Sequence, residues 1–183
     1  HELPEIRSFN NDNLNYLHFT ENDIFNVLTN LDPNKACGPD GIPGIFLRQC
    51  ALSLTPSLTY LFNLSMETGI IPIDWKKANV VPVFKKGSKI SVENYRPISL
   101  LSVISKCLER CIFNKIYPIL DQQLHINQHG FRKGHSTTTQ MTEFYDKVTK
   151  LLDSQTQCDT VFLDLSKAFD SVPHDLLVHK IRS

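Results

Sequence analysis

The sequence has 183 residues, of which 41% are hydrophobic and 21% charged, and its basic and acidic residues are equal in number. This composition suits one globular domain, or one domain with part of another, and excludes disordered, collagen-like and low-complexity chains. No apolar run approaches the roughly 18–20 residues of a membrane helix. The five Cys residues form no C-x-x-C pair, so free thiols are expected rather than disulfides or zinc. Residues 75–150 hold 13 Lys and Arg residues against 5 acidic residues, which predicts an anionic partner for this middle segment.

The first 41 residues are predicted to contain one short helix between two segments without regular structure. Residues 1–19 are polar and Asn-rich, and we expect a linker or arm. A capping box from Thr20 to Asp23, followed by apolar residues at helical spacing, predicts a helix over about 21–31. Residues 32–41 contain two Pro and two Gly residues, which predicts a long surface loop.

Two further helices and a strand are predicted next. A short helix is expected over about 43–51. Another is predicted to start with Thr55 as its N-cap and Pro56 in the first helical position, and to end before Gly69. The apolar run over residues 78–84 predicts a strand, and its internal Pro makes it an edge strand.

The second half of the sequence is likewise predicted to contain both helices and strands. The basic turn at residues 85–89 favours a hairpin, and apolar spacing predicts helices over about 102–117 and 137–152. Residues 161–165 are β-prone and predict a strand, and Pro173 lies near the start of a last helix. The fold class predicted from these elements is helix-rich α+β.

One carboxylate stands out. Asp164 lies in the apolar run Val161–Leu165, and a carboxylate among apolar neighbours is costly unless it is paired or binds a metal. Mg²⁺ is usually held by one or two carboxylates together with substrate phosphates. From these residues alone, a Mg²⁺ ligand and an ordinary cap of the following turn both stay open.

Cations with interleaved aromatic residues mark a second region. No acidic residue lies between Trp75 and Val92, and Phe84 lies within this run. This composition is typical of contact with phosphate, in a nucleic acid or a nucleotide, but also of a solvated lysine-rich hairpin. The lysines are Lys76, Lys77, Lys85, Lys86 and Lys89.

Two loops add further candidates. Pro97 forces Arg96 into extended geometry, where its guanidinium could grip phosphate, although an ordinary loop Arg fits as well. The run Gln128–Ser136 contains Arg132 and Lys133 between two Gly residues, which is compatible with an anion-binding turn or a capped helix start.

Taken in order, these segments resemble the N-terminal half of a reverse transcriptase from non-LTR retrotransposons, LINE-like and especially Jockey-like. The resemblance covers roughly residues 20–183. Its specificity comes from the order and spacing of five runs. These are Lys35–Pro43, Trp75–Gly87, Asn94–Ser102, Gln128–Thr137 and Val161–His174.

The resemblance implies a right-hand polymerase that copies RNA into DNA by two-metal nucleotidyl transfer, with Mg²⁺ as cofactor. It implies that Asp164 is the first palm carboxylate and that the backbone carbonyl of Leu165 helps to bind metal. Phe169 would exclude a ribose 2′-hydroxyl, and Lys85 and Arg96 would hold the triphosphate. The other candidates would contact template or nucleic acid, and they are Lys76, Lys77, Lys86, Lys89, Arg132 and Lys133.

One departure from the family pattern is that no Tyr-x-Asp-Asp follows Asp164. We therefore expect a fragment cut from a longer protein, containing an arm (1–19), the fingers with palm-supporting helices (20–157) and a truncated first palm strand with its helix (158–183). The implied partners are an RNA template, a DNA primer, deoxynucleoside triphosphates and the missing palm and thumb, but no membrane. The family implies cytoplasm and nucleus. A non-catalytic nucleic-acid-binding module and an inert relic remain alternatives.

Overall fold

The computed structural model describes residues 17–165, 168 and 171–182, with side chains as far as His179. The chain divides into two compact units, one over residues 13–122 and one that contains residues 123–183. We call them the N-terminal and C-terminal units and describe each separately. The boundary at residues 157–158 that the sequence suggests, between fingers and first palm strand, stays a prediction. The structure agrees with the predicted α+β class, because it combines helices with a small antiparallel sheet.

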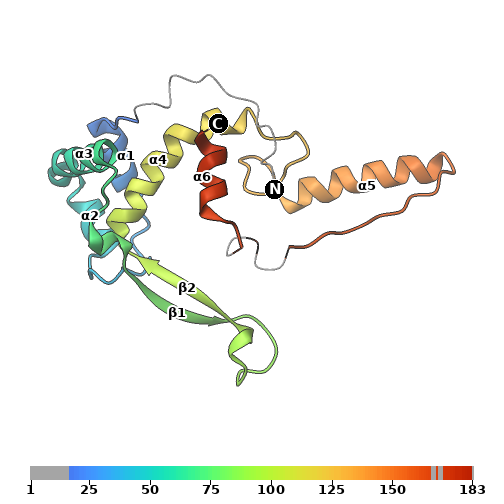
Figure 1. The fold of residues 1–183 in the computed structure, drawn as a ribbon, viewed down its shortest axis with the longest axis horizontal. Helices are drawn as coiled ribbons and strands as arrows, with labels where there is room; N and C mark the ends of the chain where they lie inside the picture. Colours follow the sequence, from blue (N-terminus) through green and yellow to red (C-terminus); the bar gives the residue numbers. More distant parts are fainter. Residues whose placement is uncertain (1–16, 166–167, 169–170, 183) are drawn as a thin grey trace. The chain divides into compact units, whose positions relative to one another are not determined.

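The N-terminal unit consists of helices and one hairpin (Figure 1). Helix α1 packs against α2, α3 and α4, and α2 also packs against α3. The hairpin β1–β2 extends away from these helices. The elements are α1 (Glu21–Thr29), α2 (Gly44–Gln49), α3 (Ala51–Thr68), η2 (Ile73–Lys76), β1 (Ala78–Phe84), η3 (Val92–Asn94), β2 (Tyr95–Leu101) and α4 (Val103–Asp121).

Helix α1 begins where the sequence predicts. The side chain of Thr20 accepts a hydrogen bond from the Asp23 N–H, and the Asp23 carboxylate accepts one from the Thr20 N–H, which completes the capping box. The predicted arm is wrong at its end, because Phe19 is fully buried in the core. The Phe19 N–H donates to Asn63 Oδ1 at 2.8 Å, and Asn63 Nδ2 donates to the Phe19 carbonyl at 2.9 Å. Residues 1–16 of that arm lie outside the described residues.

Helix α3 begins four residues before the predicted N-cap. Thr55 is buried, and its hydroxyl donates to the Ala51 carbonyl at 2.7 Å instead of capping the helix. Pro56 therefore lies inside the helix, where it removes the hydrogen bond to the carbonyl of Leu52. Because Leu52 is exposed, water can satisfy that carbonyl, and burial of Ala51 favours the earlier start. The helix ends as predicted at Gly69, whose φ is 67°.

The core of the N-terminal unit is closed by α4. Its predicted apolar stripe is confirmed, with Val103, Cys107, Leu108 and Cys111 all buried. Burial, assisted by the neighbouring thiol, raises the pKa of Cys107 to about 12, and burial also raises the pKa of Cys111 to about 11. Neither thiol is therefore an available nucleophile near neutral pH. All five cysteines are free, as expected.

The predicted strand over residues 78–84 and its hairpin are confirmed. Strand β1 pairs with β2 in antiparallel register, from Ala78 opposite Leu101 to Phe84 opposite Tyr95. The two prolines, Pro82 and Pro97, lie opposite each other. Counted from the hydrogen-bonded pair Lys85–Asn94, the two prolines form a non-hydrogen-bonded pair, so an N–H at either position would point away from the partner strand. Among the described residues no third strand lies beside β1 or β2, and the missing N–H groups therefore break no ladder bond.

The C-terminal unit contains α5 (Thr137–Asp153) and α6 (His174–Arg182). Both helices begin close to their predicted starts. The predicted strand at Val161–Leu165 is not formed, and Leu163 is 91% exposed. A strand needs a hydrogen-bonded neighbour, and the described residues provide none here. No helix among the described residues has the length and apolar character needed to span a membrane.

Candidate nucleic-acid interface

The base of the hairpin is held by the loop that follows α1. Gly38 packs against the backbone where β2 meets α4, and a Cβ at Gly38 would lie 2.5 Å from the Leu101 carbonyl carbon and the Ser102 nitrogen. The Ser102 hydroxyl donates to Asp40 Oδ2 at 2.6 Å. The Gly-Pro-Asp-Gly run, predicted only as a loop, therefore fixes the point from which the hairpin projects.

The loop between β1 and β2 is held by backbone and side-chain hydrogen bonds. The Lys85 N–H donates to the Asn94 carbonyl at 2.8 Å, which extends the ladder by one pair. Asn94 Nδ2 donates to the Ser88 carbonyl at 2.9 Å, and the Tyr95 hydroxyl donates to the Lys89 carbonyl at 2.9 Å. These bonds order the loop that carries Lys86 and Lys89, so that less conformational entropy is lost when these lysines bind a ligand.

Lys85 and Arg96 lie on the same face of the hairpin. Arg96 is opposite Val83 in the register, and Lys85 comes two residues after Val83, so the alternation of strand side chains places both cations on one side. They are diagonal neighbours, within reach for long side chains. Both are exposed, and neither forms an ion pair with a described residue. Two unpaired cations on one face can contact the same phosphate group.

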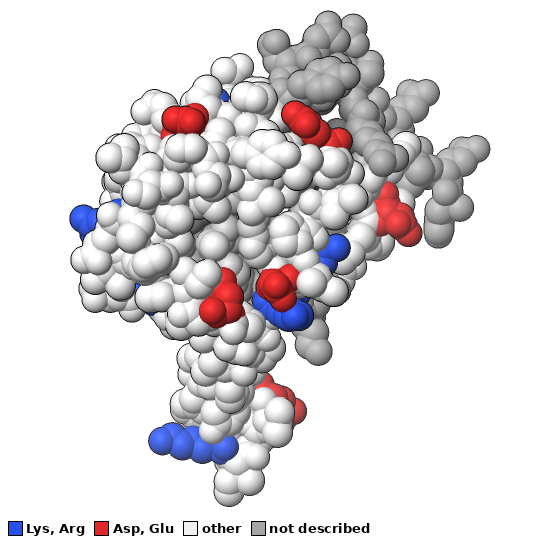
Figure 2. Space-filling model, turned by 90° about the vertical axis from the view of Figure 1, so that its left-hand side faces the viewer, with Lys and Arg blue, Asp and Glu red and all other residues white. Residues whose placement is uncertain are grey.

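The other predicted lysines have different surroundings. Lys77 Nζ lies 2.7 Å from Asp74 Oδ1, so its charge is partly neutralised. Lys89 Nζ lies 5.9 Å from the centroid of the Phe84 ring. Lys76 and Lys86 are exposed. Figure 2 views the side on which α3 lies, and there the projecting hairpin carries both basic and acidic side chains near its end.

The run Gln128–Ser136, in the C-terminal unit, precedes α5, and its last residue caps that helix. The Ser136 hydroxyl accepts from the Thr139 N–H at 3.1 Å, and the Thr139 hydroxyl accepts from the Ser136 N–H at 2.9 Å. Arg132 Nη1 donates to the His125 carbonyl at 3.3 Å, and Lys133 is exposed. Of the two interpretations of this run, the geometry supports the capped helix start.

His129 connects this loop to α5. Its ring nitrogens lie 3.0 Å from Thr139 Oγ1 and 3.0 Å from Glu143 Oε2. The hydrogen bond from Lys147, and then the one from His129, lower the pKa of Glu143. This cluster orients α5 against the loop, and its polar groups already have partners.

The segment with the predicted carboxylate is exposed. Asp164 and Leu165 both face solvent, so the expected apolar surroundings of the carboxylate are absent in this structure. Phe169 lies outside the described residues. Among the described residues no group of three or more His, Cys, Asp and Glu side chains could hold a metal ion. Asp164 alone therefore does not complete a magnesium site.

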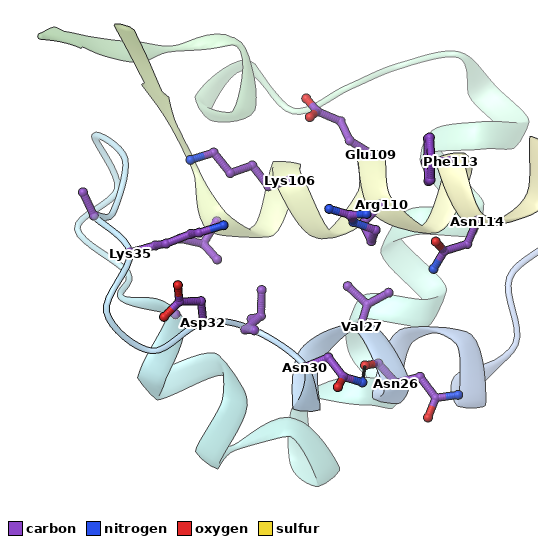
Figure 3. Close-up of a pocket in the computed structure, with 14 residues that line it drawn as sticks. Asn26, Val27, Asn30, Asp32, Lys35, Lys106, Glu109, Arg110, Phe113 and Asn114 are labelled. Atoms are coloured by element: carbon purple, nitrogen blue, oxygen red, sulfur yellow. Dashed lines mark hydrogen bonds between the residues drawn. The ribbon is translucent and has the colours of Figure 1, made fainter. Parts of the chain in front are cut away.

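A pocket of about 900 Å³ lies between the end of α1, the loop after it and α4 (Figure 3). Lys35, Lys106 and Arg110 contribute cations to its lining. Sequence reasoning missed these residues because it followed only the apolar stripe of α4. The signal was available, since Lys106, Arg110 and Asn114 recur every four residues on the polar side of that helix.

Comparisons with known proteins cover most of the chain. A family model described as "Reverse transcriptase (RNA-dependent DNA polymerase)" matches residues 83–183. The probable RNA-directed DNA polymerase from transposon BS of Drosophila melanogaster is 33% identical over 163 residues, which are 87% of this chain and 18% of that protein. That from the transposon X-element of the same species has the same identity and coverage. The RNA-directed DNA polymerase from its mobile element jockey is 30% identical over 166 residues, 89% of this chain and 18% of that protein.

Proposed function

The chain belongs to the reverse transcriptase (RNA-dependent DNA polymerase) family, and we propose that it contributes the nucleotide-binding hairpin and one catalytic carboxylate to an RNA-directed DNA polymerase. Its relatives are polymerases of Drosophila non-LTR retrotransposons, as the sequence predicts. The chain spans about 18% of the length of these relatives. The partners that we propose are therefore those of the whole protein, namely an RNA template, a DNA primer and deoxynucleoside triphosphates.

The observation that carries this proposal is that Lys85 and Arg96 lie close together on one face of the hairpin. A triphosphate needs several positive charges held at a fixed spacing. The register of β1 with β2 supplies that spacing, and the hydrogen bonds of Asn94 and Tyr95 keep the connecting loop in one conformation. Both cations are free to bind phosphate because no described acid neutralises them.

We propose Asp164 as a catalytic carboxylate of the whole protein, on the resemblance of the run Val161–His174 to the family motif. Magnesium is the metal that this role implies, and Asp164 with the Leu165 carbonyl would supply only part of its ligands. The exposed apolar run around Asp164 supports the proposal, because β-prone residues that are exposed here would be buried by neighbouring strands.

A chimaera tests the proposal. Residues 20–183 replace the matching segment of the Drosophila melanogaster jockey polymerase, and primer extension is measured on an RNA template. Asp164→Asn should lower incorporation at least roughly a thousandfold, about 4 kcal/mol in activation free energy at 1.36 kcal/mol per tenfold change. Asp159→Asn, which neutralises an exposed carboxylate in the same segment, is the matched control and should leave the rate within about twofold.

The same chimaera tests the proposed role of Phe169 in excluding ribonucleotides. Phe169→Ala should keep most of the DNA-building rate but accept ribonucleotides far better, because the ring would no longer clash with a 2′-hydroxyl. Equal loss of rate in the Asp164 and Asp159 variants would show that the carboxylate assignment is wrong. An unchanged ratio of ribonucleotide to deoxyribonucleotide incorporation would refute the role of Phe169.

A further inference from the structure

We propose that Ser88, in the loop between β1 and β2, is phosphorylated by a protein kinase that recognises basic residues, and that its phosphate occupies the cationic face of the hairpin in place of a ligand. The modification follows from the charge pattern and the exposure of the loop. Its consequence for a triphosphate rests on the proposed function of Lys85 and Arg96.

Ser88 follows two adjacent lysines at a spacing that suits recognition by such a kinase. Lys85 and Lys86 lie three and two residues before it. Kinases discriminate between substrates through charge patterns, in which acidic groups of the enzyme bind cations at fixed distances from the hydroxyl. The sequence has two other pairs of adjacent cations, Lys76–Lys77 and Arg132–Lys133, and neither is followed by Ser or Thr at the same distance.

The loop presents Ser88 to an enzyme. Residues 85–90 are all exposed, and in Figure 1 their loop lies at the end of the hairpin, away from the helices of the N-terminal unit. Gly87 has a φ of 89°, so the backbone turns directly before Ser88. Among the described residues the Ser88 hydroxyl has one hydrogen-bond partner, the Ile90 N–H at 3.3 Å. Because the oxygen accepts in this bond, the hydroxyl proton is available for transfer.

Two other serines near cations have hydroxyls with structural roles. Ser91, in the same loop, is half-buried and donates to Glu93 Oε1 at 2.8 Å. Its acidic neighbour would also repel the acidic groups of the kinase. Ser136, after the basic run in the C-terminal unit, caps α5 by accepting from the Thr139 N–H at 3.1 Å. Ser88 is therefore the preferred acceptor.

The reaction is phosphoryl transfer from ATP. The Ser88 hydroxyl oxygen attacks the γ-phosphorus, the bond from that phosphorus to the oxygen bridging the β- and γ-phosphates breaks, and ADP leaves. The serine proton passes to a carboxylate of the kinase. The phosphoserine that results carries a charge of about −1.5 to −2 at neutral pH, with three strong acceptor oxygens.

The backbone of Ser88 is held on the side of the hairpin where Lys85 and Arg96 lie. Asn94 is opposite Lys85 where the ladder is extended, so strand alternation places its side chain on that side. Asn94 Nδ2 donates to the Ser88 carbonyl at 2.9 Å. A Cβ at Gly87 would lie 2.8 Å from the same nitrogen, so the loop packs closely against this side chain. From this position we expect the phosphate to reach the long side chains of Lys85 and Arg96.

The phosphate would change the charge at the end of the hairpin. Residues 85–96 contain four cations and one acid, a net charge of +3 that phosphoserine would lower to about +1. Charge-assisted hydrogen bonds from Lys85 and Arg96 to the phosphate would use the donors that a triphosphate needs. Lys89 stands apart, because its Nζ lies 5.9 Å from the centroid of Phe84, whose side chain alternates with that of Lys85.

The first experiment measures the modification without any assumption about function. The full chain is incubated with ATP and the catalytic subunit of cyclic-AMP-dependent protein kinase, and the modified residue is identified by peptide mass spectrometry. One phosphoryl group should be added, at Ser88. Lys85→Gln/Lys86→Gln should lower kcat/KM for phosphorylation at least about tenfold. Lys147→Gln/Lys150→Gln removes the same charge from α5, where both lysines are paired with acids, and should leave kcat/KM unchanged.

The second experiment locates the phosphate on the hairpin. The second ionisation of phosphoserine has an ordinary pKa of about 6, and nearby cations favour the dianion and lower that pKa. A pH titration of the phosphorylated full chain, followed by phosphorus NMR, should show the lowered pKa. Arg96→Gln leaves the two lysines of the kinase motif intact and should bring the pKa back towards about 6. Lys150→Gln should leave it unchanged.

The third experiment tests the consequence for anion binding. Calorimetry compares the binding of inorganic triphosphate to the phosphorylated and the unphosphorylated chain, and phosphorylation should weaken it at least about tenfold. Ser88→Ala, treated with the same kinase, should bind like the unphosphorylated chain. Failure of the unmodified chain to bind triphosphate would count against the proposed function and this consequence, whereas the first two experiments decide the site and position of the phosphate by themselves.

Three results would overturn the inference. Phosphate found mainly on a residue other than Ser88 would refute the site. Equal rates of phosphorylation for the two double variants would show that the adjacent lysines do not direct the kinase. An equal pKa of the phosphate in the unsubstituted chain and in Arg96→Gln would show that it lies away from the cationic face.

Discussion

The Ser102 hydroxyl donates a hydrogen bond of 2.6 Å to Asp40 Oδ2, across 62 residues of sequence. Ser102 is fully buried at the junction of β2 and α4, and Asp40 belongs to the loop after α1. One hydrogen bond therefore connects the loop, the hairpin base and the start of α4. The direction of the hairpin depends on this junction, and so do the positions of Lys85 and Arg96.

Ser102→Ala should lower the free energy of unfolding of the N-terminal unit by about 1.5 kcal/mol. This is the lower end of the range for hydrogen bonds to charged groups, because Asp40 is exposed and can be rehydrated. Urea unfolding followed by fluorescence of the single tryptophan, Trp75, measures it. In a double-mutant cycle with Asp40→Ala, which removes the acceptor, the two losses should not add. Additive losses would contradict a direct interaction.

Gly38→Ala should destabilise the same unit by roughly 1–3 kcal/mol, because the new methyl group would overlap the backbone at Leu101 and Ser102. The midpoint of thermal unfolding at Trp75 should fall. Gly130→Ala adds the same group where nothing lies within 4 Å, and should leave that midpoint unchanged. Equal midpoints for the two variants would mean that the loop can move away from the hairpin base at little cost.

The stability contributed by Asp23 should depend on pH. Burial opposes ionisation of Asp23, but hydrogen bonds from Thr20 and Lys115 outweigh it and lower the pKa of Asp23 below its ordinary 3.8. A lowered folded-state pKa gives stability that is complete well above pH 3.8 and is lost as the pH falls through 3.8 towards the folded value. Asp23→Asn should therefore cost about 1 kcal/mol at pH 7 and progressively less below pH 4.

Urea unfolding at several pH values between 3 and 7 measures this dependence. Asp74→Asn, which removes the exposed partner of Lys77, is the control and should change the unfolding free energy by less than about 0.5 kcal/mol at any pH. A difference between wild type and Asp23→Asn that stays constant down to pH 3 would rule out the ionic contribution.

Lys85→Gln/Arg96→Gln should weaken binding of single-stranded RNA and lower the slope of log K against log salt by about 1.4. Substitution of Lys77, already paired with Asp74, together with Lys150, already paired with Asp146, should change the slope much less. Filter binding between 50 and 200 mM salt distinguishes the two pairs. An unchanged slope in the Lys85/Arg96 variant would identify the hairpin as a solvated surface without a phosphate ligand.

Local patterns in the sequence determined most helices and the hairpin. The capping box at Thr20, the apolar stripe of α4 and the basic turn after Phe84 act within a few residues, so their effect can be seen without a fold. The family was also evident from the sequence, because the order of short motifs needs no coordinates.

Contacts between distant residues decided the rest. Phe19 is buried because Asn63 binds its backbone, and α3 starts early because Ala51 finds a place in the core. The segment Val161–Leu165 remains unpaired, since a β-prone sequence becomes a strand only beside a neighbour that accepts its hydrogen bonds. The pocket below α4 likewise exists only where the loop carrying Lys35 meets Lys106 and Arg110, 71 and 75 residues later in the chain. Sequence spacing determines which face of a helix is polar, and only tertiary packing determines what that face meets.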